Sequence, residues 1–197
     1  MVTTPIETVP ANEAARRPLR PEECALAVID IQEKLLPPIW ESKRMVRNSQ
    51  LLIRMALAMN LPVLVSTQYA KGLGQTIPEI ASLLPDVNVI DKLDFGCFGN
   101  GEYCSAVSKL PDRNTLLLCG METHICVYQT ARGLVDRGWH AHVAIDACAS
   151  RTKLNWKIGR DLMTRAGAVV TSTETVVFDL LGCAGTEDFK ALSRLIR

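Results

Sequence analysis

The stretch from Leu116 to Thr130 constrains the fold more than any other part of the chain. The run from Thr115 to Cys119 is typical of a strand buried on both faces, as in parallel sheets that helices cover. Gly120 ends this run. From Thr123 the apolar side chains recur at helical spacing, which predicts Thr123 as the N-cap and places Cys126 in the first turn. A strand is therefore expected to pass directly into a helix, with a cysteine at the junction.

Strands and helices are expected to alternate along the rest of the chain. Strands are predicted at 24–30, 62–66, 87–90, 115–119, 140–146 and 168–171. Helices are predicted at 43–59, 77–84, 102–110, 153–166 and 187–196 and from 123 onward, and 173–181 is a mixed apolar segment. This alternation predicts an α/β fold in three layers, with helices flanking a six-stranded, mainly parallel, Rossmann-like sheet.

Length and composition are those of one domain with a full core. The chain has 197 residues, of which 48% are hydrophobic and 22% charged, and a net charge of +1. Residues 1–22 contain several prolines and little periodicity, so we expect an extended or disordered arm there and the domain at 23–197. The low net charge gives no indication of nucleic acid or an anionic membrane as partner, and no apolar run reaches the length of a membrane span.

The cysteines indicate a reducing environment. There are seven, an odd number, without a C-x-x-C pair and without a recognisable signal peptide. We therefore expect free thiols and a cytoplasmic protein. The spacing is not that of a zinc site, and neither a metal nor another cofactor is expected.

Three chemically different side chains lie at the ends of predicted strands. Asp30 ends the first strand, Lys92 follows the third, and Cys126 lies in the turn after the fourth. In parallel α/β sheets the functional crevice lies outside the carboxyl ends of the strands, so the three should meet at one edge. Each also has an ordinary explanation, namely a turn cap for Asp30, a solvated lysine for Lys92 and a packed core thiol for Cys126.

Together these groups suit nucleophilic catalysis. The first turn of a helix favours a thiolate over a thiol at Cys126. A carboxylate within hydrogen-bond reach can take the thiol proton and later deliver it to a departing amine, which is the role expected of Asp30. An ammonium beside both groups stabilises their charges and the developing tetrahedral oxygen, which is the role expected of Lys92.

The other titratable residues are poorer partners for Cys126. His124 is two residues away on the same helix, where side chains do not face each other, so it is expected to pack or to line the pocket. His140 and His142 lie near the start of the fifth strand, away from the active edge. Asp146 ends that strand, and the residues after it favour a turn or cap role over that of a second acid.

Three sequence elements, in this order, resemble the isochorismatase-like cysteine hydrolases, which include nicotinamidases and N-carbamoylsarcosine amidase. They are Val28-Ile-Asp30-Ile-Gln32, then Lys92, then Gly120-Met-Glu-Thr123-His-Ile-Cys126-Val. The similarity extends from Cys24 to Leu181. Two further motifs resemble the isochorismatase domain-containing subgroup: Gln68-Tyr-x-Lys-Gly-Leu-Gly-x-Thr-x-Pro-Glu79 and Glu122-Thr-His-x-Cys-Val-x-Gln-Thr130.

The resemblance implies an Asp30, Lys92 and Cys126 triad with the roles given above. It also implies a cis peptide between Met121 and Glu122, which aims the backbone N–H groups of Glu122 and Cys126 at the oxyanion of the tetrahedral intermediate. Members of this family act on small molecules and commonly assemble, so a small-molecule substrate and a homo-oligomer are expected.

Two departures from the family narrow the activity. Metal-dependent nicotinamidases have an Asp-x-His element after the second strand, where this chain has Ser66-Thr-Gln68-Tyr69, so a metal site of that kind is not expected. Isochorismatases act on a vinyl ether and typically lack the nucleophilic cysteine, whereas Cys126 is present here. This difference favours acyl chemistry.

The leading hypothesis is a cofactor-independent cysteine hydrolase that cleaves a small amide-type C–N bond through a thioester on Cys126. The loops 31–42, 67–78 and 93–101 are expected to shape the pocket, with contributions from Gln68, Tyr69, Phe95 and Glu122. Two alternatives stay open. One is a vinyl-ether hydrolase in which Asp30 donates the proton and Cys126 is incidental, and the other is a non-catalytic member that binds a metabolite or a protein.

Overall fold

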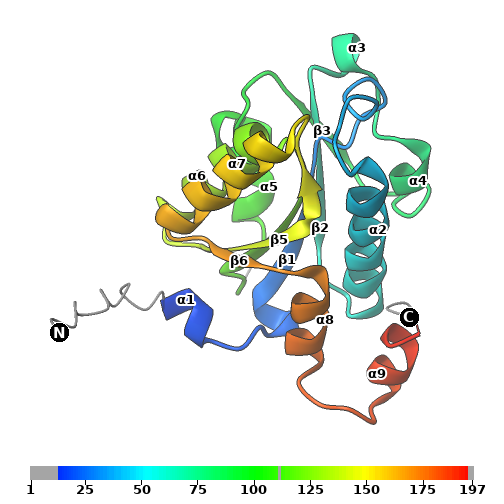
Figure 1. Cartoon of the computed structure of the whole chain (residues 1–197). Helices are drawn as coiled ribbons and strands as arrows, with labels where there is room; N and C mark the ends of the chain where they lie inside the picture. Colours follow the sequence, from blue (N-terminus) through cyan, green and yellow to red (C-terminus); the bar gives the residue numbers. More distant parts are fainter. Residues whose placement is uncertain (1–12, 111, 195–197) are drawn as a thin grey trace, which may run out of the picture.

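A six-stranded sheet forms the centre of the computed structural model, which describes residues 13–110 and 112–194 (Figure 1). The strand order is β3-β2-β1-β4-β5-β6, and all neighbouring strands are parallel. The strands are β1 (Cys24–Ile29), β2 (Val63–Gln68), β3 (Val89–Lys92), β4 (Thr115–Met121), β5 (His140–Ala149) and β6 (Val169–Thr171). The parallel sheet predicted from the sequence is confirmed.

Helices cover both faces of this sheet, which confirms the three-layer α/β prediction (Figure 1). One face carries α2 (Ser42–Ala58), α4 (Pro78–Ala81) and α8 (Thr173–Leu181), and the other carries α5 (Gly101–Ser108), α6 (Tyr128–Val135) and α7 (Lys153–Arg165). The remaining helical segments are short. They are α1 (Glu13–Arg16), η1 (Pro21–Glu23), α3 (Ala70–Leu73), η2 (Cys97–Gly99), η3 (Thr123–Val127) and α9 (Glu187–Leu192).

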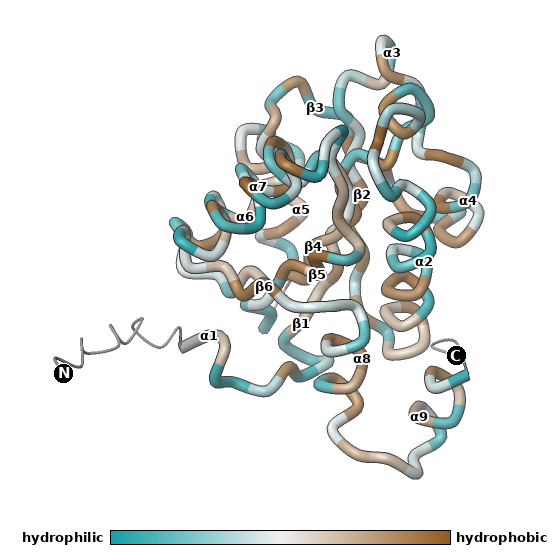
Figure 2. The backbone as a smooth tube through the Cα atoms, in the orientation of Figure 1, coloured by the Kyte–Doolittle hydropathy of each residue, from teal (hydrophilic) through white to brown (hydrophobic). Residues whose placement is uncertain are grey.

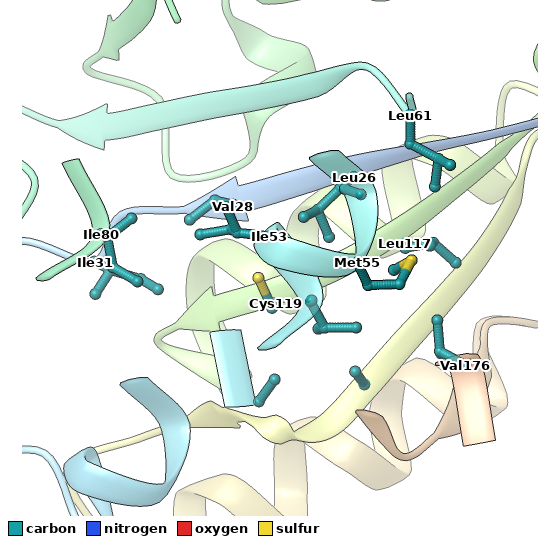
Figure 3. Close-up of a cluster of buried hydrophobic side chains, with 14 of the residues drawn as sticks. Leu26, Val28, Ile31, Ile53, Met55, Leu61, Ile80, Leu117, Cys119 and Val176 are labelled. Atoms are coloured by element: carbon teal, nitrogen blue, oxygen red, sulfur yellow. The ribbon is translucent and has the colours of Figure 1, made fainter. Parts of the chain in front are cut away.

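Two apolar cores join the layers, one on each face of the sheet. Alternate residues of β1 contribute to different cores: Leu26 and Val28 to the core under α2, and Ala27 to the core under α5 and α6. Every residue of β1 is buried, because β1 lies in the middle of the sheet. Figure 3 shows the core under α2, to which Val28 of β1 and Ile53 of α2 both contribute. Burial of one such side chain contributes about 1.5–3 kcal/mol to folding.

The long helix α2 is amphipathic. Its buried residues recur every three or four positions, as expected for a helix with one face on a core: Met45, Ser49, Leu52, Ile53, Met55 and Ala56. Figure 2 shows the alternation of hydrophilic and hydrophobic residues along α2, in contrast to the mostly apolar central strands. The helix therefore covers the sheet on one side and meets water on the other.

Gly120 closes β4 onto β1 near the carboxyl edge of the sheet. It pairs with Ile29 and has a φ of +123°, a conformation that favours glycine. A Cβ atom at this position would overlap the carbonyl oxygen of Ile29. Glycine therefore permits the close approach of the two strands from which Asp30 and the Cys126 turn emerge.

Two segments after β4 differ from the sequence-based expectation. Strand β5 continues to Ala149, past Asp146, and its pairing with β4 is irregular between Leu118 and Gly120. Asp146 therefore lies within the strand, where its carboxylate accepts hydrogen bonds from Asn48 and Thr173 at 3.0 and 2.7 Å. The mixed apolar segment 173–181 is the helix α8.

The structure describes the predicted N-terminal arm only in part. Residues 1–12 lie outside the described residues, so the expectation for them stays a prediction. From residue 13 to 23 the chain forms α1 and η1, and Leu19 is buried with its backbone N–H donating to Asp179 of α8 at 3.1 Å. This part of the arm packs against the domain. Among the described residues, no helix is long and apolar enough to cross a membrane.

Candidate active site

The predicted catalytic residues come from three elements at the carboxyl edge of the sheet. Asp30 directly follows β1, Lys92 is the last residue of β3, and Cys126 lies in η3 after β4. Strand β2 separates β1 from β3, and the length of the lysine side chain spans that gap. The structure brings the three side chains together, as expected from their positions at strand ends.

Lys92 is fully buried and ion-paired with Asp30. Its Nζ donates to Oδ2 of Asp30 at 2.7 Å, and both side chains have no exposed surface. The same Nζ donates to Oε1 of Gln68 at 2.9 Å and to the carbonyl oxygens of Asp94 and Phe95 at 3.2 and 3.1 Å. Burial is the largest single effect and would lower the pKa of Lys92, but the charge of Asp30, together with smaller effects of Cys126 and Cys97, outweighs it and the pKa is raised. Lys92 is therefore an ammonium at neutral pH.

The second oxygen of Asp30 is held by a residue that sequence reasoning missed. The hydroxyl of Ser66 on β2 donates to Oδ1 of Asp30 at 2.8 Å, and the backbone N–H of Asp30 donates to the Ser66 carbonyl at 3.1 Å. Asp30 has a φ of 52°, a left-handed conformation that aspartate tolerates better than most residues. Ser66 pairs with Ile29 in the parallel register of β1 and β2, and this position beside the end of β1 is the feature that indicates a contact with Asp30.

Cys126 is a buried thiol rather than a thiolate in the resting site. The residue is 6% exposed and lies close enough to Asp30 for the carboxylate charge to act on it. Burial raises the pKa of the thiol, the charge of Asp30 raises it further, and Lys92 opposes this only in part. The sequence suggested a thiolate because Cys126 lies in the first turn of a helix. Desolvation and the adjacent carboxylate outweigh that effect.

The turn that carries Cys126 is a π-helical segment. Glu122, and not Thr123 as predicted, is the N-cap of η3, and η3 continues into α6. The peptide bond between Met121 and Glu122 is cis. Gly159 of α7 packs so closely against η3 that a Cβ there would lie 2.7 Å from the backbone nitrogen of His124. Helix α7 therefore fixes the turn from behind.

A pocket with a volume of about 370 Å³ opens above Cys126. Its other lining residues are Lys34, Leu35, Pro38, Gln68, Leu73, Phe95, Glu122, Ile125 and Arg151. Three of the four residues predicted to shape the pocket, Gln68, Phe95 and Glu122, line it. Tyr69 does not line it, and its ring instead lies against Gly72.

Glu122 lines the pocket, but its carboxylate is bound by Arg151. Its carboxylate accepts from Nε of Arg151 at 3.1 Å and from the backbone N–H of Arg151 at 2.9 Å. Sequence reasoning missed Arg151, although its place just after β5, the neighbour of β4, was the signal. His124 contacts Ser150, with 3.1 Å between Nδ1 and Oγ, and does not line the pocket.

Two glutamines connect the loops around the site. The side chain of Gln32 donates to the carbonyl oxygens of Gln68 and Gly74, and it accepts from the backbone N–H of Gln68 at 2.7 Å. The side chain of Gln68 then reaches Lys92 and Leu93. The loop after β1 is thus joined to β2 and β3 beside the ion pair. In the part of the chain that the structure describes, no group of three or more His, Cys, Asp or Glu could hold a metal ion.

Comparison with known proteins shows that this chain is similar to members of the isochorismatase family. The model of the Isochorismatase domain family matches residues 24–175. The chain is 36% identical over 182 residues to the "secreted isochorismatase effector Isc1" of Phytophthora sojae, which covers 91% of this chain and 87% of that protein. It is 30% identical over 177 residues to isochorismatase domain-containing protein 2 of Rattus norvegicus, covering 90% of this chain and 82% of that protein.

A solved structure has the same fold. The structure described as MAR1 ribonuclease from Caenorhabditis elegans matches with a TM-score of 0.85 and 31% sequence identity. The match covers 91% of this chain and 92% of that chain. The similarity therefore extends over nearly the whole described domain, including the strands that supply the site.

Proposed function

The chain belongs to the isochorismatase family of hydrolases, and on that premise we propose that it is a cysteine hydrolase that cleaves a small amide-type C–N bond. Asp30, Lys92 and Cys126 are the proposed catalytic residues. The observation that carries the proposal is the buried ion pair of Lys92 and Asp30 beside a thiol, Cys126, that lines a pocket. A thiol, its proton acceptor and a fixed cation are the groups that acyl transfer requires.

In the first step Asp30 takes the proton of Cys126 as sulfur attacks the amide carbon. A C–S bond forms, and the carbonyl electrons move to oxygen. The raised pKa of the Cys126 thiol supports proton transfer during the attack over a preformed thiolate. The backbone N–H groups of Glu122 and Cys126 are the proposed donors to the oxyanion. Lys92 keeps the local charge balanced while Asp30 is protonated.

In the second step the C–N bond breaks and Asp30 delivers its proton to the departing amine, which leaves a thioester on Cys126. Asp30 then removes a proton from a water molecule, and the resulting hydroxide attacks the thioester carbon. The C–S bond breaks, the thiol recovers its proton, and a carboxylic acid leaves. No step requires a cofactor.

Replacing the nucleophile tests this proposal. In a panel of small amides, Cys126→Ala should lose turnover completely, whereas Cys183→Ala should keep it, because Cys183 is an exposed thiol that does not line the pocket. The readout is release of the amine. Unchanged turnover by Cys126→Ala would exclude a thioester mechanism.

A second candidate is a vinyl-ether hydrolase, which the 36% identity to a protein named as an isochorismatase supports. In that reaction Asp30 protonates the substrate and Cys126 is incidental. Asp30→Asn would then be inactive while Cys126→Ala stayed active. The cysteine-hydrolase mechanism instead predicts that both variants lose activity. The likeness to a protein described as a ribonuclease makes RNA a useful third substrate in the same assay.

Assembly and location complete the proposal. We propose a homo-oligomer, supported by large apolar side chains at the described surface such as Leu93, Phe95 and Leu154, which are 73%, 55% and 66% exposed. A cytoplasmic location stays the expectation from the free thiols. The Phytophthora relative is described as secreted, and that property is not carried over to this chain.

A further inference from the structure

We propose that the pocket selects substrates with one negative charge at the end remote from the scissile amide, and that Lys34 recognises this charge. The inference rests on the proposed function and names its substrate class, a small amide with an apolar middle and a terminal carboxylate. The carbonyl carbon would lie at Cys126 and the carboxylate at the pocket mouth, beside the Lys34 ammonium.

The charges that line the pocket do not cancel. Its charged residues are Lys34, Glu122 and Arg151. The carboxylate of Glu122 is occupied by Arg151, through Nε at 3.1 Å and the backbone N–H at 2.9 Å, so these two charges offset each other. Below the pocket, Asp30 and Lys92 form a second neutral pair. The charge of Lys34 is left as the net charge of the pocket.

Lys34 is fixed at the pocket mouth by two hydrogen bonds. Its backbone N–H donates to the carbonyl of Leu73 at 3.1 Å, and its Nζ donates to the carbonyl of Gly72 at 3.0 Å. Within residues 13–110 and 112–194, Lys34 takes part in no ion pair. The neighbouring Glu33 is not among the lining residues, and its carboxylate accepts from the backbone N–H of Gln75 at 3.2 Å. An ammonium with spare donors therefore lies at the rim.

Five of the residues that line the pocket together with Lys34 and Cys126 have apolar side chains. They are Leu35, Pro38, Leu73, Phe95 and Ile125. These residues offer no hydrogen bonds to the middle of a substrate, so a hydrocarbon segment fits there better than a polar one. An anion at the far end would meet Lys34 in surroundings less polar than bulk water, where the attraction is stronger. The net charge and the apolar lining of the pocket therefore both favour an amide with an apolar middle and a terminal carboxylate.

A pair of alkylating probes tests the selection without knowledge of the natural substrate. The probes are N-(iodoacetyl)-γ-aminobutyrate, which carries a carboxylate, and its uncharged carboxamide. The rate at which each alkylates Cys126 is measured by peptide-level mass spectrometry at low ionic strength, which separates Cys126 from the other cysteines. The variants are Lys34→Gln and, as a matched control, Lys71→Gln. Lys71 is an exposed lysine of α3 near the same rim that does not line the pocket.

The expected result is a change in the ratio of the two alkylation rates. Lys34→Gln should lower the ratio of charged to uncharged probe by about three- to tenfold, as expected for the loss of one partly screened unit charge. The rate with the uncharged probe should stay the same, which also reports that the variant is folded. Lys71→Gln should leave the ratio unchanged.

Two results would overturn the inference. One is an unchanged ratio in Lys34→Gln, and the other is an equal decrease in Lys71→Gln, which would indicate a general surface potential. Alkylation reports on the pocket whether or not Cys126 is the nucleophile in turnover. If Cys126→Ala kept its amidase activity while the ratio still depended on Lys34, the proposed mechanism would fail and the charge selection would stand.

Discussion

At the scale of single residues, the site is organised around one buried carboxylate. Each oxygen of Asp30 has its own partner, with the Ser66 hydroxyl at 2.8 Å on one and the Lys92 ammonium at 2.7 Å on the other. The Cys126 thiol lies near the same carboxylate, whose charge raises the pKa of the thiol. A carboxylate held in this way keeps a fixed orientation toward sulfur, which a proton acceptor needs when the reacting atoms lie close together.

Removing the Ser66 hydroxyl should slow the reaction without weakening substrate binding. Ser66→Ala leaves one oxygen of Asp30 without its donor, so we expect kcat to fall by about tenfold, as for loss of one hydrogen bond to a charged group. KM should change little, because Ser66 does not line the pocket. Thr67→Ala is the matched control, since the Thr67 hydroxyl next along β2 donates to Asp91 instead. Equal effects of the two variants on kcat would refute the positioning role of Ser66.

His142 makes the stability of the fold depend on pH. Burial lowers the pKa of His142 from 6.5 to about 4, and the nearby His140 adds to the shift. The folded protein therefore holds a neutral imidazole at pH values where the unfolded chain binds a proton. The free energy of unfolding should fall as the pH drops from 6.5 toward 4, by roughly 1–2 kcal/mol between about pH 7 and 5.

Denaturant unfolding at these two pH values measures the contribution of His142. The variant His142→Gln should show a smaller difference between them than the natural chain. His140→Gln serves as the comparison and should keep most of the difference, because it leaves His142 buried and burial is the main cause of the lowered pKa of His142. An undiminished pH dependence in His142→Gln would assign the effect to other groups.

The catalytic candidates could be predicted from sequence better than the pocket could. Asp30, Lys92 and Cys126 lie at strand ends, and strand ends follow from short-range apolar patterns. Lys34 and Arg151 line the pocket only because loops from distant parts of the chain meet there, and no local pattern encodes that meeting. The protonation of the Cys126 thiol likewise depends on burial and on Asp30, which are both consequences of tertiary structure.

At the scale of elements, the strands were predicted closely because most of them contain a short apolar run; β3 is the exception, since it includes Asp91 and Lys92. The helix α8 was harder to predict, since Val176 and Val177 are β-branched and favour strands as much as helices. A local signal for it exists in Ser172, whose side chain caps the backbone N–H of Thr175 at 3.1 Å. The π-helical turn η3 has no such signal, because it depends on packing against α7.

Gly120 provides a test of how β4 meets β1. In Gly120→Ala the new Cβ overlaps the Ile29 carbonyl at a φ of +123°, so the strands must separate. We expect a loss of roughly 3 kcal/mol or more in the free energy of unfolding, from the clash and the strained backbone together. The matched control is Gly138→Ala, where φ is also positive but nothing lies within 4 Å of the new Cβ.

The control should lose only about 1 kcal/mol, the cost of the backbone conformation alone. Urea denaturation of both variants measures the difference. Similar losses in the two would show that close approach to Ile29 is not what requires glycine at position 120.

At the scale of the whole molecule, the described part of the N-terminal segment belongs to the folded unit. Leu19 is buried in the core under α2, its N–H is bound by Asp179, and Arg113 donates to the carbonyl oxygens of Pro21 and Cys24. The boundary was predicted at residue 22 because the apolar residues before it show no regular spacing. The packing continues before that residue, because a single leucine can be buried without any repeating pattern around it.

Leu19→Ala tests that membership directly. Truncating a buried leucine should lower the free energy of unfolding by about 2–3 kcal/mol. Arg20→Ala, a change at an exposed neighbouring side chain, should alter it by less than about 0.5 kcal/mol. Equal stabilities of the Leu19→Ala variant and the natural chain, in thermal and denaturant unfolding, would mean that residues 13–22 do not contribute to the fold.

The most direct measurement of the proposed chemistry is mass spectrometry of the protein quenched in acid during turnover of a small amide. The mechanism predicts an acyl group on the sulfur of Cys126, with the mass of the substrate acid less one water, and its absence in Cys126→Ala together with loss of turnover. Turnover that continues in Cys126→Ala, with no acyl group on the natural protein at any quench time, would contradict nucleophilic attack by this cysteine.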